Sequence, residues 1–342
     1  MGLQSKRVIL RADGNGKIGY GHLSRLNAFA EMISQVYELI FIISNKSDSS
    51  LINKNYKVVK IPESINFNNE INWINSNFSP TNHIIIADGY NFNSNYQSKI
   101  KKIGYKLIYI DDLLSYHMYA DCVINHAIGV DENKYFGENY VKYFLGSSYA
   151  LMRQSFIDNS QSIKKKEIKL ETAFVSFGGT NASEITHSVV EALIDFENIK
   201  KIIVVIGSSF SDSEIIDFFN REKKVELFKE VDEKLMSSLM NCSDIAIVPS
   251  STIAYELASS RCLIASGYTV QNQFHIYEGL RKNNIIFGMG NITNFDKDDF
   301  KSHIKKIISS KKELLESKLQ SQINYFDGKQ KERLIEIVNS LI

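Results

Sequence analysis

The chain has 342 residues, more than a single hydrophobic core usually supports, which predicts two domains. It carries 40 basic and 39 acidic residues, so no net field attracts polyanions, and general nucleic-acid binding has no support from the composition. Three widely spaced cysteines fit neither a disulfide framework nor a zinc ribbon. Without a signal-peptide pattern or an apolar run of about 18 residues, we expect a cytoplasmic monomer with no stable membrane insertion.

In the first half of the chain, apolar segments of strand length alternate with segments of helical spacing, which predicts a parallel sheet. The expected strands are 8–11, 39–44, 57–61, 84–88, 107–111 and 122–125. Ligands of open parallel sheets bind beyond the carboxyl ends of the strands. The polar residues at those ends are therefore site candidates, although capping of helices and turns is the alternative. They are Asp13, Asp88, Asp111, Asp112 and Asn125.

The alternation restarts in the second half, with expected strands at 172–177, 202–206, 225–228, 245–248 and 263–265. The sequence thus predicts two Rossmann-like parallel α/β domains. We expect an N-terminal domain at 1–156, a polar, lysine-rich linker at 157–168 and a C-terminal domain at 169–325. Residues 326–342 are expected to form a C-terminal helix that crosses back to the N-terminal domain.

A glycine-rich loop follows the first strand, with Gly14, Gly16, Gly19 and Gly21. Four glycines so close together favour close approach of the backbone to a ligand. The first three match a dinucleotide fingerprint, but the second expected strand ends without an acidic residue for the ribose, which argues against NAD or FAD. We expect no cofactor.

His22 stands where the first expected helix begins. The positive end of a helix disfavours the imidazolium form, so His22 would be a neutral base at physiological pH. A lone histidine is more often structural, but its place at a strand-to-helix turn favours the catalytic interpretation.

A second glycine turn, Gly178, Gly179 and Thr180, follows the first strand of the second domain. Backbone N–H groups before a helix bind anions, while an ordinary tight turn is the alternative, and no Walker A lysine follows. Further along, Ser250, Ser251 and Thr252 precede a helix that carries Glu256 on its expected first turn. This is either a capping pattern or a carboxylate for ribose hydroxyls. Gln271, Asn272 and Gln273 add neutral amides nearby.

A metal site has weak support. His117, Cys122 and His126 are close in sequence, but their spacing is irregular and Cys122 falls in an apolar strand. We therefore expect no bound metal.

Seven motifs, in this order, resemble one family: GYGHLSR, DGY, YIDD, YALMRQSF, FGGT, SSTIAYEL and QNQ. The family is the UDP-sugar hydrolase of pseudaminic acid biosynthesis, and the resemblance covers nearly the whole chain. It implies a MurG-like GT-B fold, with two Rossmann-like domains facing across a cleft. It also implies metal-independent hydrolysis of UDP-2,4-diacetamido-2,4,6-trideoxy-β-L-altropyranose to UDP and the free sugar. That sugar leads to pseudaminic acid, a nonulosonic acid of flagellins and surface glycans.

The resemblance also assigns roles to residues. His22 matches the general base, and Tyr90 lies near the sugar, with water attacking the anomeric carbon with inversion. The expected substrate-binding residues are Arg11, Asp13, Gly19, Gly21, Asp88, Asp112 and Arg153. The expected nucleotide-binding residues are Gly178, Gly179, Thr180, Phe228, Ser251, Thr252, Glu256, Asn272 and Gln273. The sequence departs from the family at Gly89, where members often have histidine, and at Pro249 and Ser250, where glycine or alanine is frequent.

Three alternatives stay open. A MurG-like glycosyltransferase would use the same scaffold and pass the sugar to an acceptor hydroxyl. A hydrolysing UDP-N-acetylhexosamine 2-epimerase would need further carboxylates near the sugar, and the aspartates at the expected strand ends supply candidates. A UDP-sugar-binding protein without catalysis would leave His22 without a role.

Overall fold

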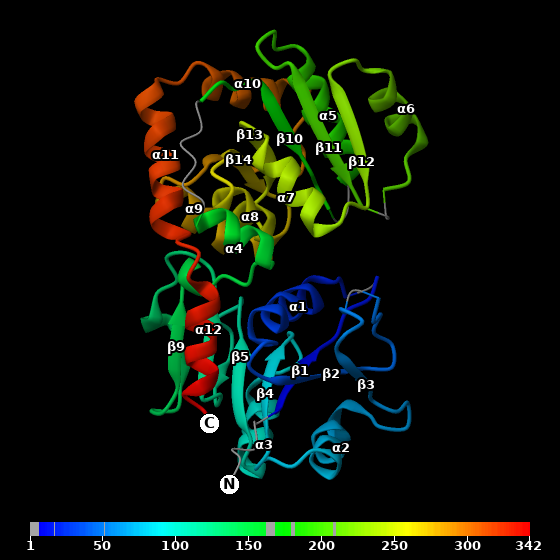
Figure 1. Ribbon diagram of the computed structural model, residues 1–342, viewed down its shortest axis with the longest axis vertical. Coiled ribbons are helices and arrows are strands. Elements are labelled where there is room, and N and C mark those ends of the chain that lie inside the picture. The colour runs from blue at the N-terminus through cyan, green and yellow to red at the C-terminus, as the bar shows by residue number, and fades with distance from the viewer. Residues whose placement is uncertain (1–6, 17, 51, 162–167, 179–181, 208–209) are drawn as a thin grey trace. The chain divides into compact units, whose positions relative to one another are not determined.

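The computed structural model describes residues 7–16, 18–50, 52–161, 168–178, 182–207 and 210–342 (Figure 1). The chain forms two compact units. Unit 1 comprises Met1–Gln154 and Lys329–Ile342, and unit 2 comprises Ser155–Gly328. Within the described ranges, no helix is both long and apolar enough to cross a bilayer.

Unit 1 is built on a seven-stranded sheet in which every neighbouring pair is parallel. Its strand order is β3-β2-β1-β4-β5-β7-β9. The strands are β1 (Arg7–Ala12), β2 (Glu38–Ile43), β3 (Lys57–Lys60), β4 (His83–Asp88), β5 (Lys106–Ile110), β7 (Cys122–Asn125) and β9 (Lys142–Leu145). A small separate pair consists of β6 (His117–Met118) and β8 (Phe136–Gly137). The helices of this unit are α1 (Gly21–Ile33), α2 (Glu70–Asn77), α3 (Ser94–Ile103) and α12 (Gln330–Asn339).

The central strands of unit 1 are apolar throughout because both faces of the sheet are covered. The register places Ile9 of β1 opposite Ile40 of β2 and Ile85 of β4. These side chains share one buried cluster with Ile74 of α2 and Ile100 of α3. Since alternate residues of a strand point to opposite faces, Val8, Leu10 and Ala12 of β1 are buried on the other face, where α1 packs.

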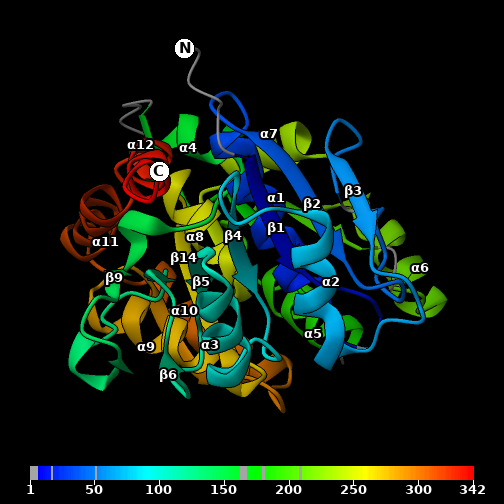
Figure 2. The same cartoon turned by 90° about the horizontal axis from the view of Figure 1, so that it is seen from below.

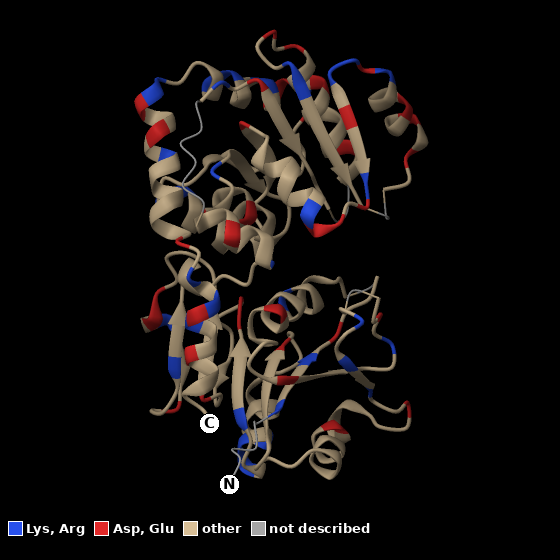
Figure 3. Cartoon of the chain, viewed as in Figure 1, with Lys and Arg blue, Asp and Glu red and all other residues tan. Residues whose placement is uncertain are grey.

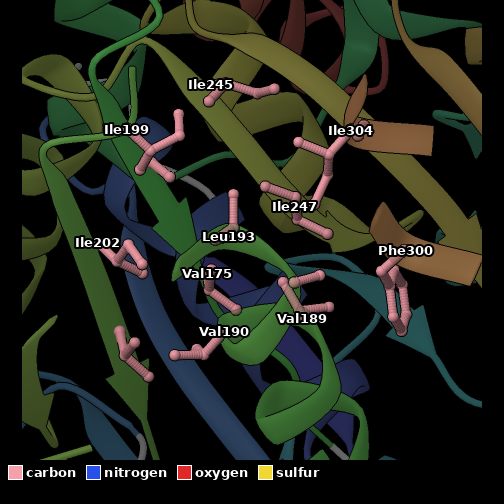
Figure 4. Packing of buried hydrophobic residues seen from close by; sticks show 14 of the residues in the cluster. Val175, Val189, Val190, Leu193, Ile199, Ile202, Ile245, Ile247, Phe300 and Ile304 are labelled. Atoms are coloured by element: carbon pink, nitrogen blue, oxygen red, sulfur yellow. The ribbon is translucent and has the colours of Figure 1, made fainter. Parts of the chain in front are cut away.

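Unit 2 has a six-stranded parallel sheet in the order β12-β11-β10-β13-β14-β15. Its strands are β10 (Thr172–Val175), β11 (Lys201–Ile206), β12 (Val225–Lys229), β13 (Ile245–Pro249), β14 (Leu263–Tyr268) and β15 (Phe287–Asn291). Its helices are α4 (Gln154–Gln161), α5 (Ala182–Ile194), α6 (Ser213–Arg221), α7 (Glu233–Asn241), α8 (Thr252–Ser259), α9 (Phe274–Lys282), α10 (Lys297–Ile308) and α11 (Lys312–Tyr325). Figure 4 shows its core, where Val189 and Leu193 of α5 lie among Val175 of β10 and Phe300 and Ile304 of α10.

The fold differs from the sequence prediction in two places. Helix α4 takes up the first five residues of the segment expected to be a linker, because Phe156 and Ile157 anchor it as buried side chains. The rest of that segment, up to residue 167, lies outside the described residues. Strands β9 and β15 and the short pair β6 and β8 were not expected.

Helix α12 returns to unit 1 after the whole of unit 2 has been completed. It packs against α1 and against the short 3-10 turn Ser147–Tyr149. The Gln330 side chain donates to the Ser147 carbonyl at 3.2 Å. The helix is the red element next to β9 in Figure 1, and Figure 2 views it nearly end-on. Unit 1 is therefore made from two separate segments of the chain.

Candidate functional site

The strand order of each unit creates one natural place for a ligand. From β1 the sheet of unit 1 continues to β2 on one side and to β4 on the other. The crevice outside the carboxyl ends at such a switch point is where open parallel sheets bind their ligands. The equivalent place in unit 2 lies between β10 and β13.

His22 lies at this position in unit 1. It is the second residue of α1, and Gly19 makes the turn into the helix with a φ of +82°. The imidazole is nearly buried, and its Nδ1 lies 2.7 Å from Oδ1 of Asp88. Asp88 is the last residue of β4 and is fully buried. The structure thus pairs two predicted site residues that are 66 positions apart in sequence.

Arg25 completes this cluster, and the sequence prediction did not include it. Its Nε and Nη2 donate to the two oxygens of Asp88 at 2.8 and 2.7 Å, and its Nη1 donates to Asp112 at 2.8 Å. The sequence did contain a signal, because residues three apart on a helix lie on the same face. Arg25 is three residues after His22.

The charges of the cluster support one another. Burial alone would raise the pKa of Asp88, but the Arg25 charge and the hydrogen bond from His22 outweigh it and lower the pKa below its ordinary value. Burial likewise opposes the charge on Arg25, and its two carboxylates outweigh burial and raise its pKa. Asp88 is therefore an ionised acceptor at neutral pH.

This ionised carboxylate determines how His22 bonds. Nδ1 lies within 2.8 Å of Arg25 Nη2 as well as 2.7 Å from Asp88, but it cannot accept from one and donate to the other at once. An ionised carboxylate only accepts hydrogen bonds, so Nδ1 carries the proton and donates it to Asp88. In the neutral imidazole, this bond leaves the lone pair on Nε2.

Tyr90 and Asp112 lie beside this pair. The Tyr90 ring meets the His22 ring edge to face, with centroids 4.6 Å apart, and it is 39% exposed. Its hydroxyl is 3.5 Å from Asp112, at the limit of a hydrogen bond. A side chain at Gly89 would come within 2.9 Å of Phe92, which explains why this chain has glycine in the DGY motif.

Two of the strand-end candidates, Asp111 and Asn125, form hydrogen bonds that stabilise the fold. Asp111 accepts from the Tyr135 hydroxyl at 2.8 Å and from two backbone N–H groups, and burial raises its pKa. Asn125 donates to the same hydroxyl at 2.9 Å. The next residue, His126, is buried, and its pKa is lowered to about 4 by burial and by Arg25.

Arg11 lies in a second buried network. It is 1% exposed, and it donates to both oxygens of Glu70 at 2.7 and 2.9 Å and to Asp13 at 2.8 Å. Asp13 also accepts from the Ser44 backbone at 2.6 Å. Arg11 therefore orders the loop after β1, and a direct contact between Arg11 and a substrate stays a prediction.

The glycines of that loop fall into two groups. A Cβ at Gly14 would meet Leu23 at 2.7 Å, and Gly19 has a left-handed backbone, so the fold itself needs both. A Cβ at Gly16 or Gly21 would meet nothing within 4 Å. Nothing in the described part of the fold requires glycine there, whereas close approach of a ligand would.

In unit 2, Gly178 follows β10, and a Cβ added to it would meet nothing within 4 Å. Gly179 and Thr180 lie outside the described residues. Gly207, at the carboxyl end of β11, has the same open space, and the sequence prediction did not include it. Its position directly after a strand was the available signal.

The segment after β13 differs in detail from its prediction. Ser251 precedes α8, and its side chain makes no capping hydrogen bond. Glu256 is the fifth residue of α8 and lies on the second turn, not the first, and it is buried. The position three residues after the cap is Ala254, so the capping-box alternative fails. Thr252 opens the helix, and Ser250 bonds to Ser266 at 2.7 Å.

The remaining candidates are less closely grouped. Gln271–Gln273 form a 3-10 turn in which Gln273 accepts from the Thr269 backbone at 2.9 Å, while Asn272 is exposed. Phe228 is half-buried in the edge strand β12, and Arg153 is half-buried directly before α4. Their roles stay predictions.

The sequence matches no family model. It is 27% identical to an uncharacterized protein of Methanocaldococcus jannaschii over 266 residues, which are 73% of this chain and 53% of that protein, so the match spans about half of that relative. It is 25% identical to the UDP-2,4-diacetamido-2,4,6-trideoxy-β-L-altropyranose hydrolase of Campylobacter jejuni over 274 residues, 78% of this chain and 93% of that one. The spore coat polysaccharide biosynthesis protein SpsG of Bacillus subtilis is 22% identical over 250 residues, 72% of each chain.

Solved structures match over almost the full length. MurG of Acinetobacter baumannii superimposes with a TM-score of 0.66 at 9% identity, covering 98% of this chain and 99% of that one. MnaA of S. aureus, solved with UDP, gives a TM-score of 0.64 at 12% identity, covering 98% of both chains. Likeness at such low identity is evidence of fold.

The chain has the GT-B fold. Each half of this GT-B fold contributes one parallel sheet, and the predicted fold class is confirmed. Among the described residues, no three His, Cys, Asp or Glu side chains lie close enough together to hold a metal ion. His117, one of the residues weighed for a metal, is instead 3.1 Å from Glu138.

Proposed function

We propose that this protein hydrolyses UDP-2,4-diacetamido-2,4,6-trideoxy-β-L-altropyranose to UDP and the free sugar. The observation that carries the proposal is the buried pair of His22 and Asp88, 2.7 Å apart at the switch point of unit 1. Similarity to the Campylobacter hydrolase over 93% of that enzyme supports the choice of substrate.

The proposed reaction assigns the proton to His22. Nε2 of His22 removes a proton from water as the water oxygen bonds to the anomeric carbon from the face opposite UDP. The bond between that carbon and the UDP oxygen breaks, and UDP leaves with the electron pair, which inverts the anomeric centre. Asp88 stabilises the imidazolium that forms, because it is already ionised and accepts a hydrogen bond from Nδ1–H.

The other candidate residues have supporting roles in this proposal. Tyr90 contacts the sugar beside the base. Gly21, at the start of α1, lets the sugar or the diphosphate approach the helix N-terminus, which favours negative charge. In unit 2, Gly178, Gly179, Thr180, Ser251, Thr252, Glu256, Asn272, Gln273 and Phe228 bind UDP.

The proposal is tested with the full chain and this UDP-sugar in ¹⁸O-labelled water with EDTA and no acceptor. NMR follows UDP and free sugar, and mass spectrometry locates the label. The variants are His22→Ala and, as a matched control, His187→Ala, whose imidazole lies on α5 beside Glu191. We expect a loss of about 100- to 10,000-fold in kcat for His22→Ala and little change for the control.

The position of the label separates the possible reactions. Label at the anomeric hydroxyl of the sugar supports water attack at carbon. Label in UDP would mean cleavage at phosphorus and contradict the mechanism. If the substrate stays intact until an acceptor alcohol is added, the result would favour a glycosyltransferase. If the released sugar is epimerised at C2, the result would favour the epimerase.

A further inference from the structure

A second hollow lies in unit 1, away from the His22 cluster. It has a volume of about 670 Å³, and its wall includes Lys101 and Lys102 of α3, Lys106 at the start of β5 and Lys142 at the start of β9. Because these strands are parallel, their starts lie at the opposite edge of the sheet from Asp88. We call this hollow the lysine groove. Figure 3 shows basic residues gathered near the lower ends of β5 and α3.

Positive charge exceeds negative charge in the lysine groove. Asp121 is 9% exposed and lies 2.5 Å from Lys101 and 3.2 Å from Lys106, so one carboxylate serves two ammonium groups. Within the described part of the chain, Lys102 and Lys142 form no ion pair. Glu138, also in the wall, already lies 3.1 Å from His117.

The fold alone explains only part of this charge. Lysines in the last turn of a helix are favoured by the helix dipole, which accounts for Lys101 and Lys102 of α3. Lys106 and Lys142 begin parallel strands, where no such dipole acts. Like charges gathered in a hollow repel one another, and a bound anion would relieve that repulsion.

An aromatic side chain closes one side of the lysine groove. Tyr140 donates its hydroxyl to the Tyr119 carbonyl at 3.0 Å, and Lys101 Nζ lies 5.6 Å from its ring centroid. The ring is thus held in place, although it is 49% exposed. An exposed but fixed ring offers a flat apolar surface to a second ring.

We propose that the lysine groove is a second ligand site, which binds a small anion with phosphate or carboxylate groups next to a ring. Its volume falls within the range of about 300–1,000 Å³ typical of small-molecule sites. Lys102 and Lys142 bind the anionic groups, and the Tyr140 ring stacks on the ring of the ligand. The proposal does not depend on the reaction at His22.

Isothermal titration of the full chain at physiological salt tests the site, with saturating UDP present to occupy a nucleotide site in unit 2. The probes are pyrophosphate and citrate, which separate phosphate from carboxylate recognition, and AMP, which adds a ring. We expect saturable binding of at least one probe, weakened at least about tenfold by Lys102→Gln with Lys142→Gln, since two charge-assisted contacts are lost. Tyr140→Leu should weaken AMP but not pyrophosphate.

The matched control is Lys99→Gln with Lys134→Gln, which removes the same charge from exposed positions of unit 1 outside the lysine groove. Binding that falls equally in both double variants reflects net charge alone and would overturn the proposal. Absence of saturable binding for all three probes would overturn it too. If UDP itself fails to bind, the proposed function is weakened while the lysine-groove test still stands.

Discussion

Arg25 binds two carboxylates of the His22 cluster, although it is not the proposed base. Its guanidinium holds both oxygens of Asp88, so that carboxylate cannot rotate away from the imidazole. The same group reaches Asp112, which lies near the Tyr90 hydroxyl. A lysine could supply the charge but not this planar, multiple contact. Arg25 is therefore a positioning residue in the proposed reaction. It acts on His22 through Asp88 and on Tyr90 through Asp112.

His126 predicts how stability depends on pH. Its pKa is lowered to about 4 by burial and Arg25, while Asp112 and Asp88 oppose the shift. As the pH falls below about 6.5, the unfolded chain binds a proton there and the folded chain does not, so stability falls until about pH 4. Urea unfolding from pH 7 to pH 4 should show His126→Gln losing less stability than the wild type, by up to ~3 kcal/mol.

The comparison uses the slope against pH, so any destabilisation of the variant itself cancels. The matched substitution His187→Gln, at a partly exposed imidazole beside Glu191, controls for the replacement of a histidine as such. Parallel slopes for the wild type and His126→Gln would show that His126 is not held neutral by the fold.

Contacts between residues were harder to predict from the sequence when the two residues were far apart along the chain. His22, Asp88 and Asp112 could be named as site candidates because strand ends and helix starts are recognisable locally. The contacts of His22 with Asp88 and of Arg25 with Asp112 could not be predicted, because the partners are 66 and 87 residues apart and the sheet register brings them together. Glu70 gave no local signal of its contact with Arg11, 59 residues away.

At the scale of elements, glycine substitutions in the loop before α1 can distinguish an effect on stability from an effect on ligand binding. Gly21 begins the helix with open space around it, so Gly21→Ala should raise the free energy of unfolding by about 0.4–1 kcal/mol. If a ligand approaches this backbone, the same change should lower kcat/KM for the UDP-sugar. Chemical denaturation and steady-state kinetics on one preparation measure both effects.

Gly19→Ala is the matched control for this substitution. Its left-handed backbone makes any side chain unfavourable, so it should lower stability by about 1 kcal/mol or more. A Gly21→Ala variant that is more stable and fully active would remove the reason for assigning a ligand to that position.

Elements were predicted best where their composition was unambiguous. The central strands are buried runs of mainly apolar residues, and their positions came within about three residues of the structure. The unexpected β9 (Lys142–Leu145) is only half-buried, and β15 (Phe287–Asn291) contains two glycines. Both therefore lack the continuous apolar run by which a buried parallel strand is recognised.

At the scale of the whole molecule, the two units should respond differently to loss of the C-terminus. Helix α12 buries Leu334, Ile337 and Val338, and its Asn339 accepts a hydrogen bond from the Tyr37 hydroxyl. Deleting residues 329–342 should destabilise unit 1 and leave unit 2 folded. Hydrogen exchange should then quicken in β1 and β4 but not in β10 and β13.

Leu334→Ala gives a milder form of the same test. It should lower the free energy of unfolding of unit 1 by about 2–5 kcal/mol, as for other buried leucines. Equal acceleration of exchange in both sheets would show that the two units do not unfold independently.

The two-segment construction of unit 1 also bears on the order in which the protein forms during synthesis. Domains generally fold as units while the chain emerges from the ribosome. Unit 2 is continuous and is complete once Gly328 has emerged, but unit 1 still lacks α12 at that moment. We therefore expect a released chain that ends at residue 328 to hold a folded unit 2 and a protease-sensitive unit 1, so that the His22 cluster, translated first, becomes stable last.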